Sequence, residues 1–151
     1  GTRPAIAPLI EEVAKKSGSH YVNTRWVGGL LTNWTTMTMC LEKLARLDVQ
    51  LETAVPKKGF TKKDILTLTK ERERLEKFFG GLRELKGLPD LVVIVGQPHE
   101  RNAVLECEKL NIPTITLLDS NCDPTSVAYG IPANDDSARS VAFILDQLTK
   151  D

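Results

Sequence analysis

The sequence predicts a doubly wound α/β domain, a parallel sheet with helices on both faces, which is interrupted by a protruding antiparallel helical hairpin. Two apolar, β-branched runs, residues 91–95 and 114–118, alternate with helical segments in the second half of the chain. Such runs are typical of strands buried on both faces of a parallel sheet. Earlier in the chain, apolar residues recur every three or four positions over two long stretches, which predicts the hairpin.

The N-terminal segment is expected to form a helix between Pro4 and Gly18. Apolar residues recur there at helical spacing, the prolines fall in the first turns where no donor is lost, and the glycine can end the helix. Residues 20–23 follow as a short extended strand. Residues 24–34 combine two tryptophans, a glycine pair and one arginine, and we expect an ordered loop in which Thr32 or Asn33 caps the next helix.

Residues 32–85 are expected to form the hairpin, inserted between two parts of the α/β domain at 1–31 and 86–151. Thr61 and Asp64 resemble a capping box at the start of the second helix. From there to Leu82 a strict three-four alternation gives the seam pattern of a coiled coil, with Arg72 as one charged intruder. A last helix, near the C-terminus, is expected to be capped by Asn134 or Asp135.

Charge is balanced over the whole chain but not along it. There are 20 basic and 20 acidic residues in total. Residues 1–88 hold 16 basic and 10 acidic residues, net +6, whereas residues 89–151 hold 4 and 10, net −6. This pattern argues against a uniformly basic nucleic-acid clamp but allows an anionic partner for the first part. No apolar run reaches the roughly 20 residues of a membrane span, and no membrane partner is expected.

The sequence gives little support for a catalytic site or a metal site. The cysteines Cys40, Cys107 and Cys122 show neither a CxxC spacing nor a nearby histidine pair, so we expect reduced thiols. Asp135 and Asp136 could bind a metal, but acids at a helix start also complement its dipole, and we favour that interpretation. Residues 119–123 follow a parallel strand, where α/β enzymes bind ligands, yet they lack a phosphate-binding glycine run and a base–nucleophile pair. We expect no catalytic residue, metal or cofactor.

The loop with the two tryptophans is the most informative segment. Aromatic faces, a guanidinium fork and glycines that allow close backbone approach together suit structured RNA. The alternative is that both tryptophans pack into the joint between sheet and hairpin, which we favour for Trp34. A cluster of lysines at the expected hairpin tip is either a solvated turn or a contact for RNA phosphates or a neighbouring protein; it comprises Lys57, Lys58, Lys62 and Lys63.

These segments resemble the bacterial-type small-subunit ribosomal protein two family. The likeness rests on the runs HYVNTRWVGGLLTNW at 20–34, LEKFFGGL at 75–82, LPD at 88–90, NCDP at 121–124 and IPANDD at 131–136. A further frame runs from Pro89 through Glu100 and Glu106 to Pro113. The blocks cover nearly the whole chain in the order of the family, and their details are most similar to cyanobacterial and plastid members.

The resemblance implies a flavodoxin-like α/β domain that binds small-subunit rRNA near the junction of head and body, in a plastid ribosome or alternatively in the bacterial cytoplasm. It also implies partners among the other small-subunit proteins, including the large mRNA-binding one, a structural role in translation, and no catalysis. The rRNA-binding residues would be those of the loop and the basic tip, with Arg139 as a further candidate. The loop residues are Asn23, Thr24, Arg25, Trp26, Gly28, Gly29, Thr32, Asn33 and Trp34.

One departure from the family concerns the sheet. Family members carry, before the position that matches Gly1, a strand that lies between the 20–23 strand and the 91–95 strand. Two unpaired edges inside a sheet are costly. We therefore expect that strand to come from elsewhere, either from a further part of the chain or from a separate polypeptide. Two other readings stay open: a flavodoxin-like nucleotide or sugar-phosphate enzyme with its site at 119–123, and a hairpin adaptor that binds only protein.

Overall fold

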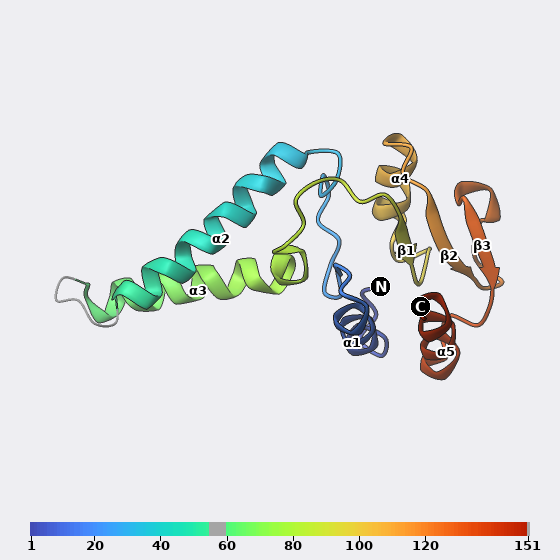
Figure 1. The fold of residues 1–151 in the computed structure, drawn as a ribbon, viewed down its shortest axis with the longest axis horizontal. Coiled ribbons are helices and arrows are strands. Elements are labelled where there is room, and N and C mark those ends of the chain that lie inside the picture. Colours follow the sequence, from blue (N-terminus) through green and yellow to red (C-terminus); the bar gives the residue numbers. More distant parts are fainter. Residues whose placement is uncertain (55–59, 151) are drawn as a thin grey trace.

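A small parallel sheet lies towards one end of the molecule in the computed structural model, which describes residues 1–54 and 60–150 (Figure 1). In the described residues the sheet has the strand order β1 (Val92–Ile94), β2 (Thr114–Leu118) and β3 (Tyr129–Pro132), and both pairings are parallel. Helix α4 (Arg101–Lys109) connects β1 to β2, and η2 (Pro124–Ser126) lies between β2 and β3. The predicted α/β class is confirmed.

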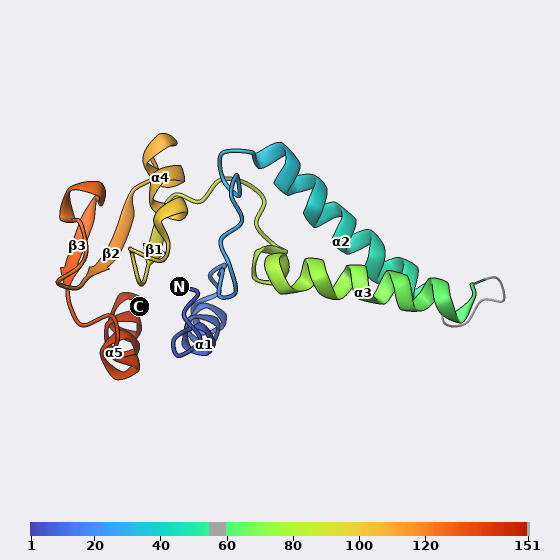
Figure 2. The same ribbon diagram turned by 180° about the vertical axis from the view of Figure 1, so that it is seen from behind.

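Helices cover both faces of this sheet. Helix α4 lies on one face, while α1 (Ala7–Ser17) and α5 (Ala138–Leu148) lie on the other (Figures 1 and 2). On the α4 side, Ile94 packs with Ala103 and Val104. On the other side a second cluster joins the sheet to the two outer helices through Ile6, Val95, Leu117, Val141 and Leu145. Burial on both faces explains why the strands read as continuous apolar runs.

The helices α2 (Trp34–Ala54) and α3 (Lys62–Phe79) lie against each other and extend away from the sheet (Figure 1). The predicted capping box is confirmed, because the Asp64 amide donates to Thr61 Oγ1 and the Thr61 amide donates to Asp64 Oδ2, at 3.2 and 3.0 Å. Arg72 donates from Nε to Asp48 Oδ1 of α2 at 2.8 Å, which accounts for its place in the apolar seam. The helical hairpin, the coiled coil and the domain limits at 31/32 and 85/86 stay predictions.

The segment that follows α3 is held against the N-terminal segment. After α3 the chain makes one turn of 3₁₀ helix, η1 (Gly80–Leu82). The Tyr21 amide donates to the Gly81 carbonyl at 3.1 Å. A Cβ at Gly81 would clash with the backbone carbonyl oxygen of Tyr21, so only glycine allows the two segments to approach this closely.

Two local predictions were wrong. Residues 20–23 form no strand in the described part of the chain, because neither neighbour offers them a ladder of backbone hydrogen bonds. Helix α5 is capped by Ser137, whose Oγ accepts from the Ser140 amide, and not by Asn134 or Asp135. The Asp135 carboxylate pairs with the Arg3 guanidinium at 3.0 Å and does not cap the helix. Of the helices described, none has the length and apolar character to cross a membrane.

Candidate nucleic-acid interface

The loop of residues 23–34 is organised by one buried carboxylate, that of Glu106 on α4. Its Oε1 accepts hydrogen bonds from Trp26 Nε1 at 3.1 Å and from the Gly29 amide at 2.8 Å. Its Oε2 accepts from the Leu31 amide at 2.8 Å and from the amide and hydroxyl of Thr32 at 3.0 and 3.2 Å. Five donors from the loop therefore converge on one side chain that is only 8% exposed.

Glu106 is held in its ionised form by these donors. Burial raises the pKa of its carboxyl, but the hydrogen bonds from Thr32, Leu31, Trp26 and Gly29 outweigh burial and lower the pKa below its ordinary value. The carboxylate is thus a permanent acceptor near neutral pH, and charge-assisted bonds of this kind are the stronger ones.

Sequence reasoning did not assign a role to Glu106, although a signal was present. On α4 the inward residues recur at positions 103, 104, 107 and 110, and position 106 falls on the same face. An acid on the apolar face of a helix needs a partner when buried. That observation would have pointed to a set of donors elsewhere in the chain, though not to which donors.

Three of the predicted loop residues face outward, Arg25, Gly28 and Asn33, whereas Thr32 is exposed but turns its hydroxyl inward to Glu106. Among the ion pairs of residues 1–54 and 60–150, none involves Arg25. The space around Gly28 is open, with no atom within 4 Å of where a Cβ would stand. Gly29 has a φ of 84°, a conformation that suits glycine and turns the chain so that the following amides meet Glu106.

The other loop candidates are engaged within the molecule. Asn23 donates from Nδ2 to Glu11 Oε2 at 3.0 Å, and Thr24 donates to the Asn23 side chain at 3.4 Å. Trp26 uses its single donor on Glu106 and packs against the sheet. Trp34 packs against the cluster around Leu31, as the alternative reading expected. The tryptophans thus hold the loop in place, and the outward surface of the loop is polar.

The remaining predicted residues do not join this surface. Lys62 and Lys63 are exposed in the first turn of α3, at the outer end of the hairpin (Figure 1). Lys57 and Lys58 lie outside the described residues. Arg139 is exposed in the first turn of α5, on the face of the sheet opposite α4. The candidate residues therefore lie in three separate regions: the loop, the first turn of α3 and the first turn of α5. Of these, the loop is the region whose conformation is fixed by buried hydrogen bonds to Glu106.

The crevice at the carboxyl ends of the strands is filled by groups of the chain itself. Arg3 pairs with Asp135 and Asp136, and Gln97 bonds to the backbone of Asp123, accepting from its amide at 2.7 Å and donating to its carbonyl at 2.8 Å. Asp119, Asp135 and Asp136 have carboxylate oxygens within 4.8 Å of one another. The Arg3 guanidinium already supplies the positive charge in that cluster, so the donor set does not suit a metal ion.

The three cysteines are free thiols, as predicted. Cys107 is fully buried beside Glu106. Burial, with a smaller contribution from the neighbouring carboxylate, raises the pKa of its thiol to about 11. A thiol in this state is a poor nucleophile.

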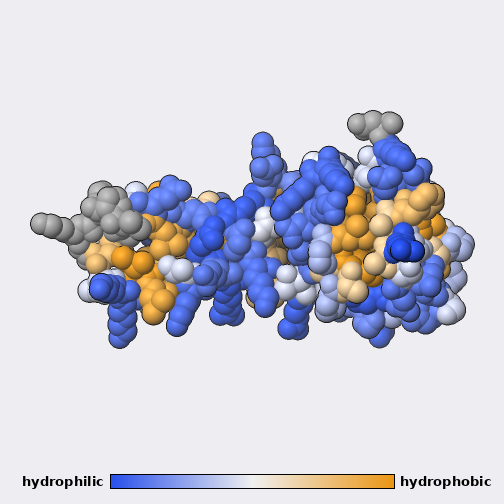
Figure 3. Space-filling view, turned by 90° about the horizontal axis from the view of Figure 1, so that it is seen from below, coloured by the Kyte–Doolittle hydropathy of each residue, from blue (hydrophilic) through white to orange (hydrophobic). Residues whose placement is uncertain are grey.

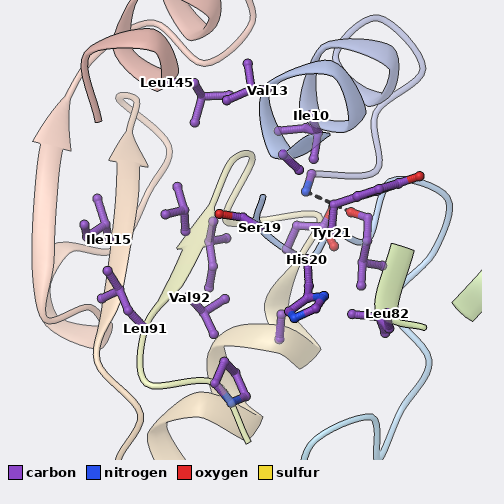
Figure 4. A pocket seen from close by; sticks show the side chains of 18 of the residues that line it. Ile10, Val13, Ser19, His20, Tyr21, Leu82, Leu91, Val92, Ile115 and Leu145 are labelled. Atoms are coloured by element: carbon purple, nitrogen blue, oxygen red, sulfur yellow. Dashed lines mark hydrogen bonds between the residues drawn. The ribbon is translucent and has the colours of Figure 1, made fainter. Parts of the chain in front are cut away.

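A cavity of about 480 Å³ separates residues 19–22 from β1 (Figure 4). Apolar side chains from both sides line it, among them Val22, Leu91 and Val93, and His20 and Tyr21 line it as well. Leu91 and Val93 remain 45% and 40% exposed. Among the described residues β1 pairs only with β2, and its other edge faces this cavity. We call this space the strand slot.

The whole chain is similar to one family of known proteins. The family model described as "Ribosomal protein S2" matches residues 1–151. The chain is 90% identical over 151 residues to "Small ribosomal subunit protein uS2c" of Ostreococcus tauri, covering 100% of this chain and 67% of that protein. It is 48% identical over 149 residues to "Small ribosomal subunit protein uS2" of Microcystis aeruginosa, covering 99% of this chain and 56% of the relative. For the protein of the same name from Gluconacetobacter diazotrophicus the identity is 46% over 143 residues, covering 95% of this chain and 54% of the relative. The chain thus spans a little over half the length of these bacterial relatives.

Proposed function

The chain belongs to the ribosomal protein S2 family, and on that premise we propose that it is a structural constituent of the small ribosomal subunit and binds the RNA of that subunit. Its proposed partners are small-subunit rRNA near the junction of head and body and other small-subunit proteins, including the large mRNA-binding one. The role is structural and not catalytic. Pairing of Arg3 with Asp135 and Asp136, and of Gln97 with the backbone of Asp123, engages the polar groups around residues 119–123, which disfavours the alternative of a nucleotide or sugar-phosphate enzyme.

The observation that carries the RNA-binding proposal is the outward face of the loop. Arg25, Gly28, Thr32 and Asn33 are exposed on a segment in which the amides of Gly29, Leu31 and Thr32 converge on Glu106. A fixed backbone with an arginine, an open glycine and short polar side chains suits the phosphate and sugar of folded RNA. Such a surface binds without first having to become ordered, which favours affinity.

Co-sedimentation tests this assignment. The complete protein that carries residues 1–151 is incubated with small subunits depleted of their resident S2 protein, and binding is compared with that of the double variant Arg25→Ala, Asn33→Ala. The matched control is Arg101→Ala, Asn102→Ala, an exposed arginine–asparagine pair outside the loop. Of the two double variants, we expect only the loop variant to bind more weakly than the wild type. Its slope of log affinity against log salt concentration should fall by the amount of about one phosphate contact. If the wild type does not co-sediment, the ribosomal role is wrong; if the loop variant binds as the wild type does, only the loop assignment is wrong.

We place the protein in the plastid ribosome, with a bacterial cytoplasmic ribosome as the alternative. The support is the much higher identity to the uS2c protein of Ostreococcus tauri than to the bacterial relatives. Fractionation of the source cells, followed by detection of the protein in the plastid or the cytosolic ribosome pool, tests this placement.

At the hairpin a protein neighbour is favoured over RNA. The hairpin exposes Met39, Val49 and Leu66, which are 62%, 58% and 55% exposed, and apolar side chains gather towards its outer end (Figure 3). RNA contacts are made mainly by basic and polar groups, whereas exposed apolar side chains are typical of protein interfaces. A photo-crosslinker at Val49 is expected to form adducts with ribosomal protein, and adducts with rRNA alone would contradict this.

We further propose that a β-strand from outside residues 1–151 occupies the strand slot. Val92 donates to the Pro113 carbonyl of the β2 side at 3.1 Å. Because peptide groups alternate in direction along a strand, the N–H and C=O of Val93 point into the slot. The slot therefore offers both apolar walls and unpaired backbone groups, and an added parallel or antiparallel strand satisfies both. The strand belongs either to a longer stretch of the same chain or to a separate polypeptide.

Amide hydrogen exchange tests the strand. Exchange at Val93 is compared between residues 1–151 prepared alone and the protein released from native ribosomes. We expect fast exchange at Val93 in the first sample and strong protection in the second, while Ile115, between β1 and β3, is protected in both. Equal exchange at Val93 in the two samples would remove the proposal, and intact-mass measurement of the native protein distinguishes one polypeptide from two.

A further inference from the structure

We propose that Glu106 is a positioning residue for RNA binding, which fixes the loop of residues 23–34 in the conformation that presents Arg25 outward. The inference rests on the proposed function of that loop. Glu106 lies on a different element, α4, and is buried, so it does not touch RNA itself. It acts by satisfying five donors that the loop backbone and side chains turn inward.

Among the described residues, few backbone hydrogen bonds lie within the loop itself. Within it, backbone hydrogen bonds join Leu30 to Val27 at 3.1 Å and Asn33 to Gly29 at 2.8 Å. The amides of Gly29, Leu31 and Thr32 instead bond to the carboxylate. Without an acceptor there, these buried donors are better satisfied by water, and the loop opens to reach it. An open loop must be ordered again before it binds RNA, and the apparent affinity falls by the fraction of molecules in the closed state.

Glutamine cannot replace Glu106, although it has the same shape. Each carboxylate oxygen accepts at least two hydrogen bonds, two at Oε1 and three at Oε2. Either orientation of a glutamine amide would set an NH₂ group, which only donates, against donors of the loop. The substitution therefore removes the acceptor from one half of the site whichever way the amide turns.

The sign of the charge makes the inference testable against simple electrostatics. Glu106→Gln removes a negative charge near a polyanion, so on Coulomb grounds alone it strengthens RNA binding or leaves it unchanged. The positioning role predicts the opposite, weaker binding. Glu108→Gln is the matched control, since Glu108 is an exposed acid on the same helix and forms none of the salt bridges of the described residues.

The experiment measures binding of the complete protein to plastid small subunits of Ostreococcus tauri that have been depleted of their resident S2 protein, over a range of salt concentrations. For Glu106→Gln we expect binding roughly 10- to 100-fold weaker, the factor that follows from leaving a buried donor set partly unsatisfied. The salt slope should stay that of the wild type, because no phosphate contact is lost. Arg25→Ala should instead lower the slope by about one, and Glu108→Gln should change neither quantity.

Trp26→Phe provides a second variant that keeps the fold and the outward residues. It removes the one hydrogen bond from the indole to Oε1 and should weaken binding in the same way but less. Amide NMR signals of Gly29, Leu31 and Thr32 should shift in both variants while those of the sheet stay unchanged. If Glu106→Gln binds like the wild type at a temperature where it is fully folded, the positioning role is wrong and Glu106 only stabilises the fold. If the wild type itself does not bind, the proposed function falls and this inference falls with it.

Discussion

Replacing Arg3 by methionine should be one of the most destabilising single changes in this protein. The Arg3 guanidinium lies 3.0 Å from Asp135 Oδ1, and it also bonds to Asp136. Asp135 is only 3% exposed, whereas the Arg3 side chain is 19% exposed. This pair joins the chain just before α1 to the turn just before α5. Methionine keeps most of the volume but leaves the Asp135 carboxylate buried without a counter-charge.

The magnitude follows from burial. Removing one partner of a buried pair costs about 3–5 kcal/mol, since the remaining charge is left uncompensated. Because Arg3 is partly hydrated, we take the lower end, about 3 kcal/mol, which is roughly 6–12 °C in Tm for a chain of this size. If Asp135→Asn is added, the buried charge is removed as well, so the double variant should be more stable than the sum of the two single changes predicts.

Urea and thermal unfolding of the wild type, both single variants and the double variant complete a double-mutant cycle. This cycle gives the interaction free energy between Arg3 and Asp135. The control is Lys15→Met, which breaks the exposed pair of Lys15 with Glu11, 2.6 Å apart, and should hardly move the midpoint. A loss of less than about 1 kcal/mol for Arg3→Met would show that Asp135 is rehydrated or finds another partner. Strict additivity in the double variant would show that the two side chains do not act as a pair.

Three further predictions concern the contact between Gly81 and Tyr21, the buried thiol of Cys107, and the effect of pH on the loop. Gly81→Ala should loosen the base of the hairpin and destabilise the protein, since its Cβ would meet the Tyr21 oxygen at 2.3 Å, whereas Gly87→Ala, with open space around it, should be neutral in the same unfolding assay. Cys107, whose thiol pKa is raised to about 11, should resist iodoacetamide at pH 7 until the protein unfolds, while mass spectrometry detects earlier labelling of the two half-buried thiols. The Glu106 carboxyl has a lowered pKa in the folded protein, so its stabilisation is present above its ordinary pKa of 4.5 and is lost as the pH falls through the lower folded value. Trp26 fluorescence should therefore report loop opening only in acid, and Glu106→Gln should lack that transition.

The sheet and its helices could be predicted because their signals are local. The runs at 91–95 and 114–118 need only their own residues to be recognised as buried strands, and the capping box of Thr61 and Asp64 spans a single turn. Residues 20–23 failed as a strand for the opposite reason, since a strand exists only with a partner and the strand slot separates these residues from β1. Pairing is a property of two segments, and one segment cannot reveal it.

The loop shows the same limit at the level of side chains. Composition singled out residues 24–34 and favoured an inward Trp34, but it could not tell that Trp26 faces inward as well while Arg25 faces outward. That division depends on Glu106, which lies 80 residues beyond Trp26 in the chain. A contact of such separation leaves a weak trace in one sequence, here a single acid on the apolar face of α4.

The same long-range contacts change the meaning of the charge pattern. The acidic residues that are buried in the described part of the chain are Glu100, Glu106 and Asp135, and all three come from the net-acidic segment 89–151. Each bonds to the first third of the chain: Glu100 to the Thr2 amide at 2.6 Å, Glu106 to the loop, and Asp135 to Arg3. Part of the net charge of −6 in residues 89–151 therefore lies inside the molecule. There these carboxylates bind the N-terminal segment and the loop and hold both against the sheet. Neutralising these three acids would raise the net charge and so favour an anionic partner by Coulomb attraction alone, yet we expect it to weaken RNA binding, because the surface that binds exists only while they hold it in place.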